Sequence, residues 1–209
     1  MGHILTVAQQ KGGSGKTTLA ANLAVAMRAR GLTVALIDTD PQGSLGRWFL
    51  ERLERVGFDE GLEFSTSSAW GASYEGEKLA RRFDVVIIDT PPKIDSDLRP
   101  ALRVAGLVLV PVASSHVDLW ATEGVLDLAR REKRAAVIVL NRVRANTRLG
   151  AEVEVAAGDL GAEVAEARFA NRVAYAEALG QGRGVVDAPS GAARDEVMVL
   201  ADEVLAMLG

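Results

Sequence analysis

The sequence contains no cysteine, and its two histidines, His3 and His116, lie far apart. Without cysteine the chain cannot form disulfides, thiolate zinc sites or cysteine-ligated iron–sulfur clusters. Two isolated histidines also do not make a histidine-rich metal site. Metal centres of these kinds are therefore not expected.

Positive charge is not in excess, and no apolar run is long enough to cross a membrane. The net charge is −4 and the sequence pI is about 5.3, unlike a strongly basic nucleic-acid binder. Local basic patches remain compatible with this balance. The first residues, "MGHILTVAQQ", lack the basic start and long apolar core of a signal peptide. We therefore expect a cytoplasmic protein.

Short apolar runs alternate with helical patterns along the whole chain. The 209 residues, 48% of them apolar, suffice for one domain over residues 1–209 with a full core. Buried strands are predicted at residues 3–9, 33–38, 84–89, 106–112 and 135–141. Helical patterns cover residues 16–30, about 44–55, about 96–104, 118–131, about 147–158, 171–180 and 191–208. This alternation predicts a doubly wound α/β fold, with a mostly parallel sheet and helices on both faces.

The segment at residues 56–78 is the hardest to interpret, and we expect an edge strand and a mobile loop there. Ligands of open α/β sheets bind at the carboxyl ends of the strands. Three predicted strands end in residues suited to nucleotide chemistry: the glycine-rich loop, "DTDPQGS" and "DTPPKIDSD". The sequence therefore predicts one site at that edge of the sheet.

The stretch "GGSGKTT" joins the first strand to the first helix, which is the context that a P-loop requires. Glycines let backbone N–H groups approach phosphates closely, and the helix N-terminus adds positive potential. We expect Lys16 to reach the β- and γ-phosphates and the Thr17 hydroxyl to bind Mg²⁺. The predicted nucleotide-binding residues of this loop are Gly12, Gly13, Ser14, Gly15, Lys16, Thr17 and Thr18. The chain is therefore predicted to be a P-loop NTPase.

The strict P-loop pattern fails at its first glycine, because Gln10 stands there and Lys11 follows it. This form, "KGGSGKTT", resembles the deviant Walker A motif of the ParA/MinD family of ATPases. The resemblance implies that Lys11 reaches the nucleotide held by a second subunit. A second cation would stabilise charge that spreads over the transferred phosphoryl group. An exposed, solvated lysine is the alternative.

Three carboxylates follow predicted strands. Asp40 lies in "DTDPQGS", which resembles the second motif of the family and implies that Asp40 orients or activates the attacking water. Asp38 could also act at the nucleotide site, or it could instead accept hydrogen bonds from nearby backbone N–H groups. Asp89 ends "DVVIID", a Walker B pattern, and is predicted to hold Mg²⁺ directly or through water. The alternative for Asp89 is a carboxylate that caps a turn. The "DTPP" after it resembles a second switch loop.

The end of the strand at residues 135–141 bears on which nucleotide is bound. Asn141 is followed by Arg142, Val143 and Arg144, so the acidic guanine reader of an N-K-x-D motif is missing and ATP is favoured. The family resemblance implies that Asn141 contacts adenine. A turn-forming asparagine is the alternative.

The motifs together cover nearly the whole chain and resemble the short, ParF-like group of ParA partition proteins, since the chain starts at the first strand. The resemblance implies ATP and Mg²⁺ as cofactors, a homodimer formed through bound ATP, non-specific binding of double-stranded DNA, and a ParB- or ParG-like adaptor. The expected role is plasmid or chromosome partitioning. Basic residues suited to DNA phosphates are Arg142, Arg144, Arg148, Arg168, Arg172 and Arg183. Each of them could instead be a solvated surface charge.

Other functions remain open on the sequence. A MinD- or MipZ-like ATPase that positions another cargo would keep every motif. A metabolic ligase on the same fold, which would join a small carboxylate to an amine after phosphoryl activation, fits the motifs less well. Membrane binding is disfavoured, because the C-terminal segment "ARDEVMVLADEVLAMLG" carries mostly acidic charges and its apolar positions suit a core helix.

Overall fold

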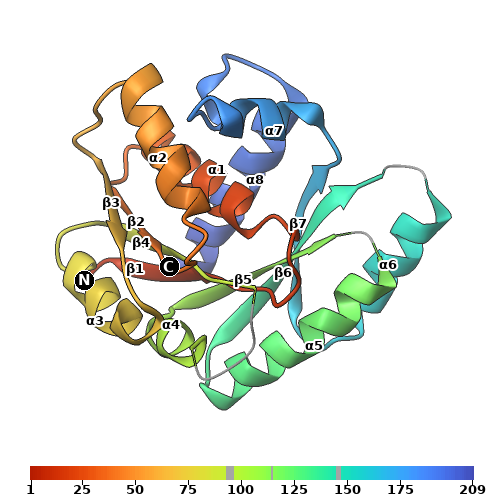
Figure 1. Ribbon diagram of the computed structural model, residues 1–209. Helices are drawn as coiled ribbons and strands as arrows, with labels where there is room; N and C mark the ends of the chain where they lie inside the picture. The colour runs from red at the N-terminus through yellow and green to blue at the C-terminus, as the bar shows by residue number, and fades with distance from the viewer. Residues whose placement is uncertain (93–96, 114, 145–146) are drawn as a thin grey trace.

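The computed structural model describes residues 1–92, 97–113, 115–144 and 147–209 (Figure 1). Its centre is a seven-stranded sheet in the order β3-β2-β4-β1-β5-β6-β7, and every pair of neighbours is parallel. The strands are β1 (His3–Val7), β2 (Val34–Asp38), β3 (Leu62–Thr66), β4 (Val85–Asp89), β5 (Leu107–Ala113), β6 (Ala135–Val143) and β7 (Glu163–Ala170). The sheet confirms the predicted doubly wound α/β fold.

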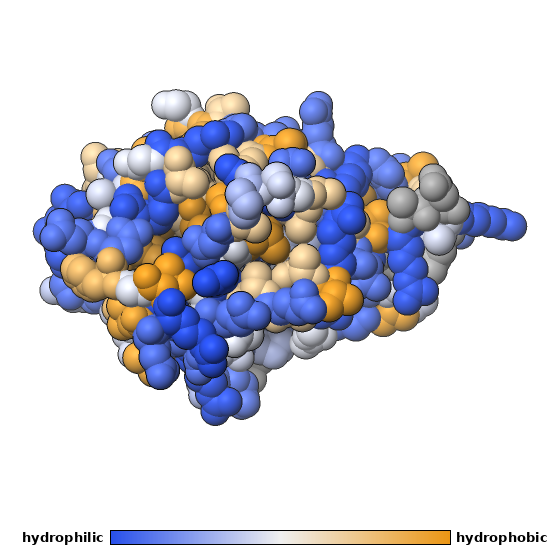
Figure 2. Space-filling view, turned by 90° about the horizontal axis from the view of Figure 1, so that it is seen from above, coloured by the Kyte–Doolittle hydropathy of each residue, from blue (hydrophilic) through white to orange (hydrophobic). Residues whose placement is uncertain are grey.

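Helices cover both faces of the sheet. They are α1 (Lys16–Ala29), α2 (Ser44–Arg55), α3 (Ala72–Leu79), α4 (Arg99–Val104), α5 (His116–Arg131), α6 (Arg148–Gly158), α7 (Val173–Gly180) and α8 (Ala192–Leu208), with short 3-10 turns η1 (Ala69–Gly71) and η2 (Val185–Asp187). In Figure 1, α1, α2, α7 and α8 lie above the sheet, and α3, α4, α5 and α6 lie below it. Seen from above, hydrophobic residues are interspersed with hydrophilic ones (Figure 2). Apolar patches on this face are thus divided by polar side chains.

The central strands are apolar on both faces because both faces are covered. On β1, for example, Leu5 packs in the cluster beneath α1 and α8, whereas Ile4 packs in the cluster against α3. A further cluster joins β5 and β6 to α4, α5 and α6. Burying a leucine or isoleucine side chain contributes about 1.5–3 kcal/mol. Packing on both faces fixes the position of each strand relative to its neighbours. It therefore also fixes where the carboxyl ends of the strands lie.

The 56–78 segment contains the predicted edge strand, β3, but the rest is more regular than a mobile loop. Residues 69–79 form η1 and α3. Ser68 starts this helical segment, since its hydroxyl accepts a hydrogen bond from the Gly71 N–H. Ala72 and Leu79 are buried against the sheet. Only Ala72, Gly76 and Leu79 of this eight-residue helix are buried, so its sequence has a weak helical period.

Strand β7 was not predicted. Its sequence "EVAEARFA" alternates, with Ala165, Ala167 and Phe169 buried on one face. Alanine is a poor strand former, so pairing with β6 and packing against α8 override the local preference. Helix α4 begins at Arg99, and the earlier start predicted near residue 96 lies outside the described residues. No helix in the described part of the chain is long and apolar enough to cross a membrane.

The C-terminal helix α8 packs into the core. Its residues Val197, Leu200 and Val204 are fully buried, and the helix packs against α1 and β7. The buried apolar residues of α8 therefore form one face against the core, as predicted for a core helix, whereas Val199 and Met207 are exposed.

Candidate functional site

The glycine-rich loop lies between the carboxyl end of β1 and the start of α1. Gly13 and Gly15 have φ angles of 77° and 95°, a region that favours glycine. Gly15 is the N-cap of α1, and no side chain caps the helix. The first N–H groups of α1 thus remain open to an anion, as a phosphate-binding loop requires.

Lys16 begins α1 and is 7% exposed. Burial lowers the pKa of its ammonium group, while the negative charges of Asp89 and Asp40 raise it. A buried lysine that is only partly compensated gains from a nearby phosphate. The phosphate-binding role of Lys16 stays a prediction.

Thr17 and Asp89 meet beside Lys16. The Thr17 hydroxyl donates a 2.7 Å hydrogen bond to Asp89 Oδ2. Asp89 Oδ1 and the Ser14 hydroxyl are buried without a hydrogen-bond partner among the described residues. Buried polar atoms are rarely left unpaired, so these oxygens are suited to contact a ligand. A hydroxyl beside a carboxylate oxygen fits Mg²⁺, a hard cation that keeps waters and nucleotide phosphates in its shell.

The ionisation of Asp89 reflects this environment. Its side chain is 1% exposed, and burial raises its pKa to about 7. The hydrogen bond from Thr17 and the charge of Lys16 act in the opposite direction, and the charge of Asp38 adds to the rise. A bound cation would stabilise the charged carboxylate.

Asp38 and Asp40 have different surroundings. Asp38 is opposite Asp89 in the register of β2 and β4 and is 3% exposed. Its carboxylate accepts hydrogen bonds from the N–H groups of Asp40 and Gly46, which supports the structural alternative for Asp38. Burial raises the pKa of Asp38. Asp40 is partly exposed, and the only hydrogen bond of its carboxylate within the described residues accepts the Gln42 N–H. Asp40 is therefore the carboxylate available to a ligand.

Asn141 reaches the phosphate loop itself. Its Nδ2 donates a 2.8 Å hydrogen bond to the Ser14 carbonyl, and its Oδ1 accepts one from the Arg142 N–H. A Cβ on Gly15 would lie 2.2 Å from Asn141 Nδ2. The side chain thus braces the loop, which the sequence did not indicate. Its contact with adenine stays a prediction.

Lys11 has an intramolecular partner that the sequence did not reveal. Its Nζ lies 2.7 Å from Asp118 Oδ1, and the side chains are 39% and 5% exposed. Asp118 is on the first turn of α5, where the Ser115 hydroxyl hydrogen bonds to its other carboxylate oxygen and accepts its N–H. The "SHVD" spacing of a helix cap was the available signal. Lys11 is therefore neither buried nor a free surface charge.

The predicted DNA-binding arginines do not form one cluster of free charges. Arg148, Arg168 and Arg172 form ion pairs with Glu152, Glu154 and Glu196, respectively. Arg142 and Arg144 follow Asn141 at the end of β6, are exposed, and have no ion pair among the described residues. Arg172 and Arg183 line a cavity of about 530 Å³ together with Arg194. DNA binding by these residues stays a prediction.

The predicted second switch loop is only partly described. Thr90 follows Asp89, and its hydroxyl donates a hydrogen bond to the Val7 carbonyl at the end of β1. Residues 93–96 lie outside the described residues.

The chain is similar to known proteins over most of its length. Residues 5–183 match the model of the CobQ/CobB/MinD/ParA nucleotide binding domain. The chain is 28% identical over 210 residues to maintenance of carboxysome distribution protein A of Halothiobacillus neapolitanus, covering 96% of this chain and 95% of that protein. It is 33% identical over 147 residues to the chromosome-partitioning ATPase Soj of Thermus thermophilus, covering 58% and 59%.

A solved structure shows the same fold. The cell division ATPase MinD of Pyrococcus furiosus superposes with a TM-score of 0.84 at 21% identity, covering 99% of this chain and all of that one. The matched family model covers most of the chain and includes the phosphate loop, Asp40, Asp89 and Asn141. The chain therefore belongs to the CobQ/CobB/MinD/ParA nucleotide-binding domain family, and its motifs are those of a ParA-type deviant Walker ATPase.

Proposed function

We propose that this chain is an ATPase that binds Mg²⁺ and ATP and completes its site by dimerising through the bound nucleotide. The observation that carries the proposal is the Thr17–Asp89 contact next to buried Lys16, with an unpaired Asp89 oxygen. The deviant loop with Lys11 supports the dimer. Absence of an acidic guanine reader after Asn141 supports ATP.

Each side chain has a distinct task in the proposed reaction. Lys16 and the open N–H groups of α1 hold the phosphates. Thr17 and Asp89 would hold Mg²⁺, which neutralises negative charge on the transferred phosphoryl group when it is bound. Asp40 accepts a hydrogen bond from the attacking water and orients it. Positioning and charge stabilisation together carry most of the catalysis in phosphoryl transfer.

Lys11 must leave Asp118 to serve a second subunit. Nucleotide bound in the facing copy offers more negative charge than one carboxylate does, so dimerisation can exchange the two partners. Each subunit then lends Lys11 to the nucleotide of the other.

Lys11→Ala tests the proposal. We expect the variant to bind ATP as a monomer and to lose both the ATP-dependent dimer and hydrolysis, as measured by light scattering after gel filtration and by phosphate release. Asp40→Ala is the comparison, because we expect that variant to form the ATP-dependent dimer and to hydrolyse ATP slowly. Normal dimerisation and hydrolysis by Lys11→Ala would contradict the role of the second lysine.

For the cellular role, we propose partitioning of a cargo over DNA with a ParB- or ParG-like adaptor. Similarity to Soj, a chromosome-partitioning ATPase, supports DNA as the surface over which the cargo is partitioned. Arg142 and Arg144 are the first candidates, because Arg148, Arg168 and Arg172 are engaged by glutamates. Replacing both with alanine should weaken DNA binding and reduce the slope of log affinity against log salt by about two. An unchanged slope would exclude them.

A second candidate role is positioning of a protein cargo. It is favoured by the similarity, over nearly the full length, to a protein named for carboxysome distribution. Both roles require ATPase activity that rises with DNA and a partner protein. Stimulation by a small carboxylic acid instead would favour the metabolic ligase.

A further inference from the structure

The side chain of Asn141 joins the end of β6 to the glycine-rich loop. Its Nδ2 donates a 2.8 Å hydrogen bond to the Ser14 carbonyl, and the two residues are only 7% and 2% exposed. Strand β5 lies between β1 and β6, so the amide spans the carboxyl end of β5 to reach the loop. The residue of β5 in register with Asn141 is Ala113, which has a small side chain. One side chain therefore connects two parts of the site that are not neighbours in the sheet.

A bulge in β6 directs the Asn141 side chain. Between Leu140 and Val143, β6 contains one residue more than the facing stretch of β7. Arg142 has a φ of 54°, a left-handed conformation that is uncommon for a residue other than glycine. Its N–H group donates a 2.8 Å hydrogen bond to Asn141 Oδ1. Bulges next to active sites redirect side chains, and here both polar atoms of the amide are held before any ligand binds.

On the loop side, Asn141 holds one particular peptide group. The Ser14 carbonyl and the Gly15 N–H belong to the same planar peptide, so they point in opposite directions. Gly15 has a φ of 95° and is the N-cap of α1. A Cβ on Gly15 would lie 2.2 Å from Asn141 Nδ2, so a larger residue would displace the amide. Fixing the Ser14 carbonyl from one side therefore fixes the direction of an N–H group at the start of α1.

We propose that Asn141 is a positioning residue that sets the phosphate affinity of the loop, whatever base the phosphates carry. Backbone donors that are already held in the binding orientation bind more tightly, because less conformational entropy is lost on binding. After its two hydrogen bonds, the amide keeps one Nδ2 hydrogen and one Oδ1 lone pair. The predicted contact with adenine is compatible with this role and separate from it. The proposal rests on the proposed nucleotide-binding function.

A ligand without a base separates the two roles of Asn141. The probe is magnesium tripolyphosphate, which offers linked phosphates and no adenine, and its binding is measured by isothermal titration calorimetry. Asn141→Ala should weaken this binding about five- to tenfold, because the loop loses the hydrogen bond that orders it. A loss confined to ATP, with tripolyphosphate bound as tightly as by the wild type, would show that Asn141 acts only on the base. That result would overturn the proposal.

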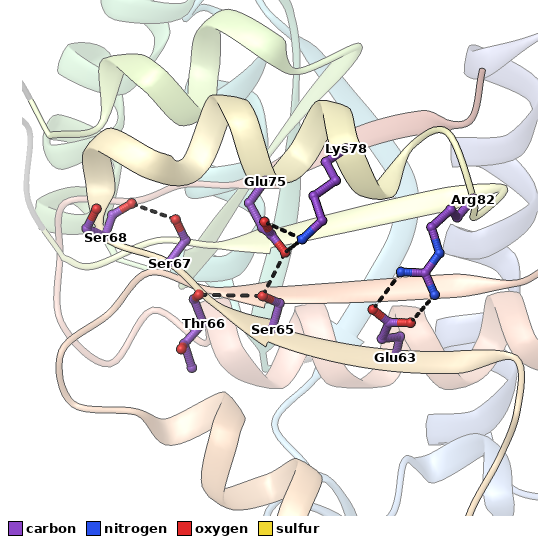
Figure 3. Close-up of polar contacts among 8 residues, drawn as sticks. All are labelled: Glu63, Ser65, Thr66, Ser67, Ser68, Glu75, Lys78 and Arg82. Atoms are coloured by element: carbon purple, nitrogen blue, oxygen red, sulfur yellow. Dashed lines mark hydrogen bonds and ion pairs between the residues drawn. The ribbon is translucent and has the colours of Figure 1, made fainter.

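Ser65→Ala is the matched control. The Ser65 hydroxyl donates a 3.0 Å hydrogen bond to Glu75 and so joins β3 to α3 at the edge of the sheet (Figure 3). Like the contact of Asn141, it ties two segments together, but it does not involve the glycine-rich loop. Ser65→Ala should therefore bind tripolyphosphate as the wild type does. Equal losses in both variants would mean that any loosening of the fold weakens binding, and the role assigned to Asn141 would be wrong.

The order of the loop is also measured without a ligand. Trypsin cleaves after lysine, and cleavage between Lys11 and Gly12 requires the loop to open locally. Asn141→Ala should speed this cleavage about fivefold, as followed by mass spectrometry. Cleavage after Lys133, just before β6 begins, should not change and serves as the internal control. Equal acceleration at both bonds would show general unfolding and contradict the positioning role.

Asn141→Asp is a second variant in case Asn141→Ala does not fold, which circular dichroism checks. Its carboxylate still accepts the Arg142 N–H but has no hydrogen for the Ser14 carbonyl, so cleavage at the loop should again be faster. Unchanged cleavage and unchanged tripolyphosphate binding in a protein that hydrolyses ATP would overturn the proposal and leave the proposed function standing. Tripolyphosphate binding that depends on Asn141, in a protein that does not hydrolyse ATP, would do the reverse.

Discussion

Lys11 Nζ lies 2.7 Å from the buried carboxylate of Asp118, so the lysine predicted to serve a second subunit is held within its own chain. The contact joins the phosphate loop to the first turn of α5. Asp118 therefore competes with the nucleotide of a facing subunit for the Lys11 ammonium group. Lys11 must break its ion pair with Asp118 before it can reach that nucleotide.

Replacing Asp118 with asparagine should strengthen ATP-dependent dimerisation. The neutral amide holds Lys11 less firmly, so Lys11 is released more easily to the second subunit. We expect the dimer dissociation constant to fall by a factor of about five or more. Analytical ultracentrifugation with a non-hydrolysable ATP analogue measures the dimer dissociation constant. The double variant Lys11→Ala/Asp118→Asn is the control and should dimerise no better than Lys11→Ala. A weaker dimer in Asp118→Asn would mean that Asp118 positions Lys11 for its partner instead.

Asp40→Ala should slow hydrolysis and leave ATP-dependent dimers. Removing a group that orients the water affects the chemical step, and such groups typically contribute about 10²–10⁴-fold. Single-turnover phosphate release measures the rate, and light scattering measures the dimer. Asp38→Asn is a useful contrast, since Asp38 holds the Asp40 and Gly46 N–H groups and its loss should disturb the turn. If Asp40→Ala fails to dimerise, the role assigned to Asp40 is wrong.

Much of the candidate site could be predicted from the sequence, because its motifs are short and contiguous along the chain. The run from Gly12 to Thr18 contains turn and helix signals directly after a predicted strand, and Asp89 ends an unbroken apolar strand. The structure brings Thr17 and Asp89 together because β1 and β4 are neighbours with Val7 opposite Asp89. Sequence order alone does not give that pairing.

What the sequence did not give depends on long-range contacts. The Lys11–Asp118 pair and the Asn141–Ser14 hydrogen bond join residues more than 100 positions apart. Strand β7 is held by its neighbours despite its alanines, and α3 is held by apolar contacts with the sheet and follows η1, which a serine caps. Local propensity carries no information about such partners.

Asp89 should make the ligand-free protein less stable as pH rises. Its pKa is raised to about 7 by burial, from an ordinary value of 3.8. Between these values the folded state keeps a proton that the unfolded state has released. Raising the pH through this window therefore lowers the free energy of unfolding, by at most about 1.4 kcal/mol per pH unit.

Urea denaturation at pH 5, 6, 7 and 8, without nucleotide or divalent cations, checks this sign. Asp89→Asn cannot ionise, so the difference in stability between variant and wild type should grow in favour of the variant up to about pH 7 and then level off. Other titrating groups cancel in the difference. A constant difference across the range would show that Asp89 is ionised in the folded protein throughout.

Arg52 should be the most important ion-pairing residue for the attachment of α2. Its guanidinium lies 2.8 Å and 3.2 Å from the two oxygens of Asp187 and also donates to the Gly182 carbonyl. The Arg52 side chain is 8% exposed, so Arg52→Ala would leave Asp187 without its charge partner in a largely buried setting. We expect a loss of about 3 kcal/mol, or roughly 6–12 °C in melting temperature. Arg55, on the same helix, pairs with Glu51 in solvent, and Arg55→Ala should change the melting temperature little. Similar losses in both variants would mean that helix propensity, and not the Asp187 contact, determines the effect.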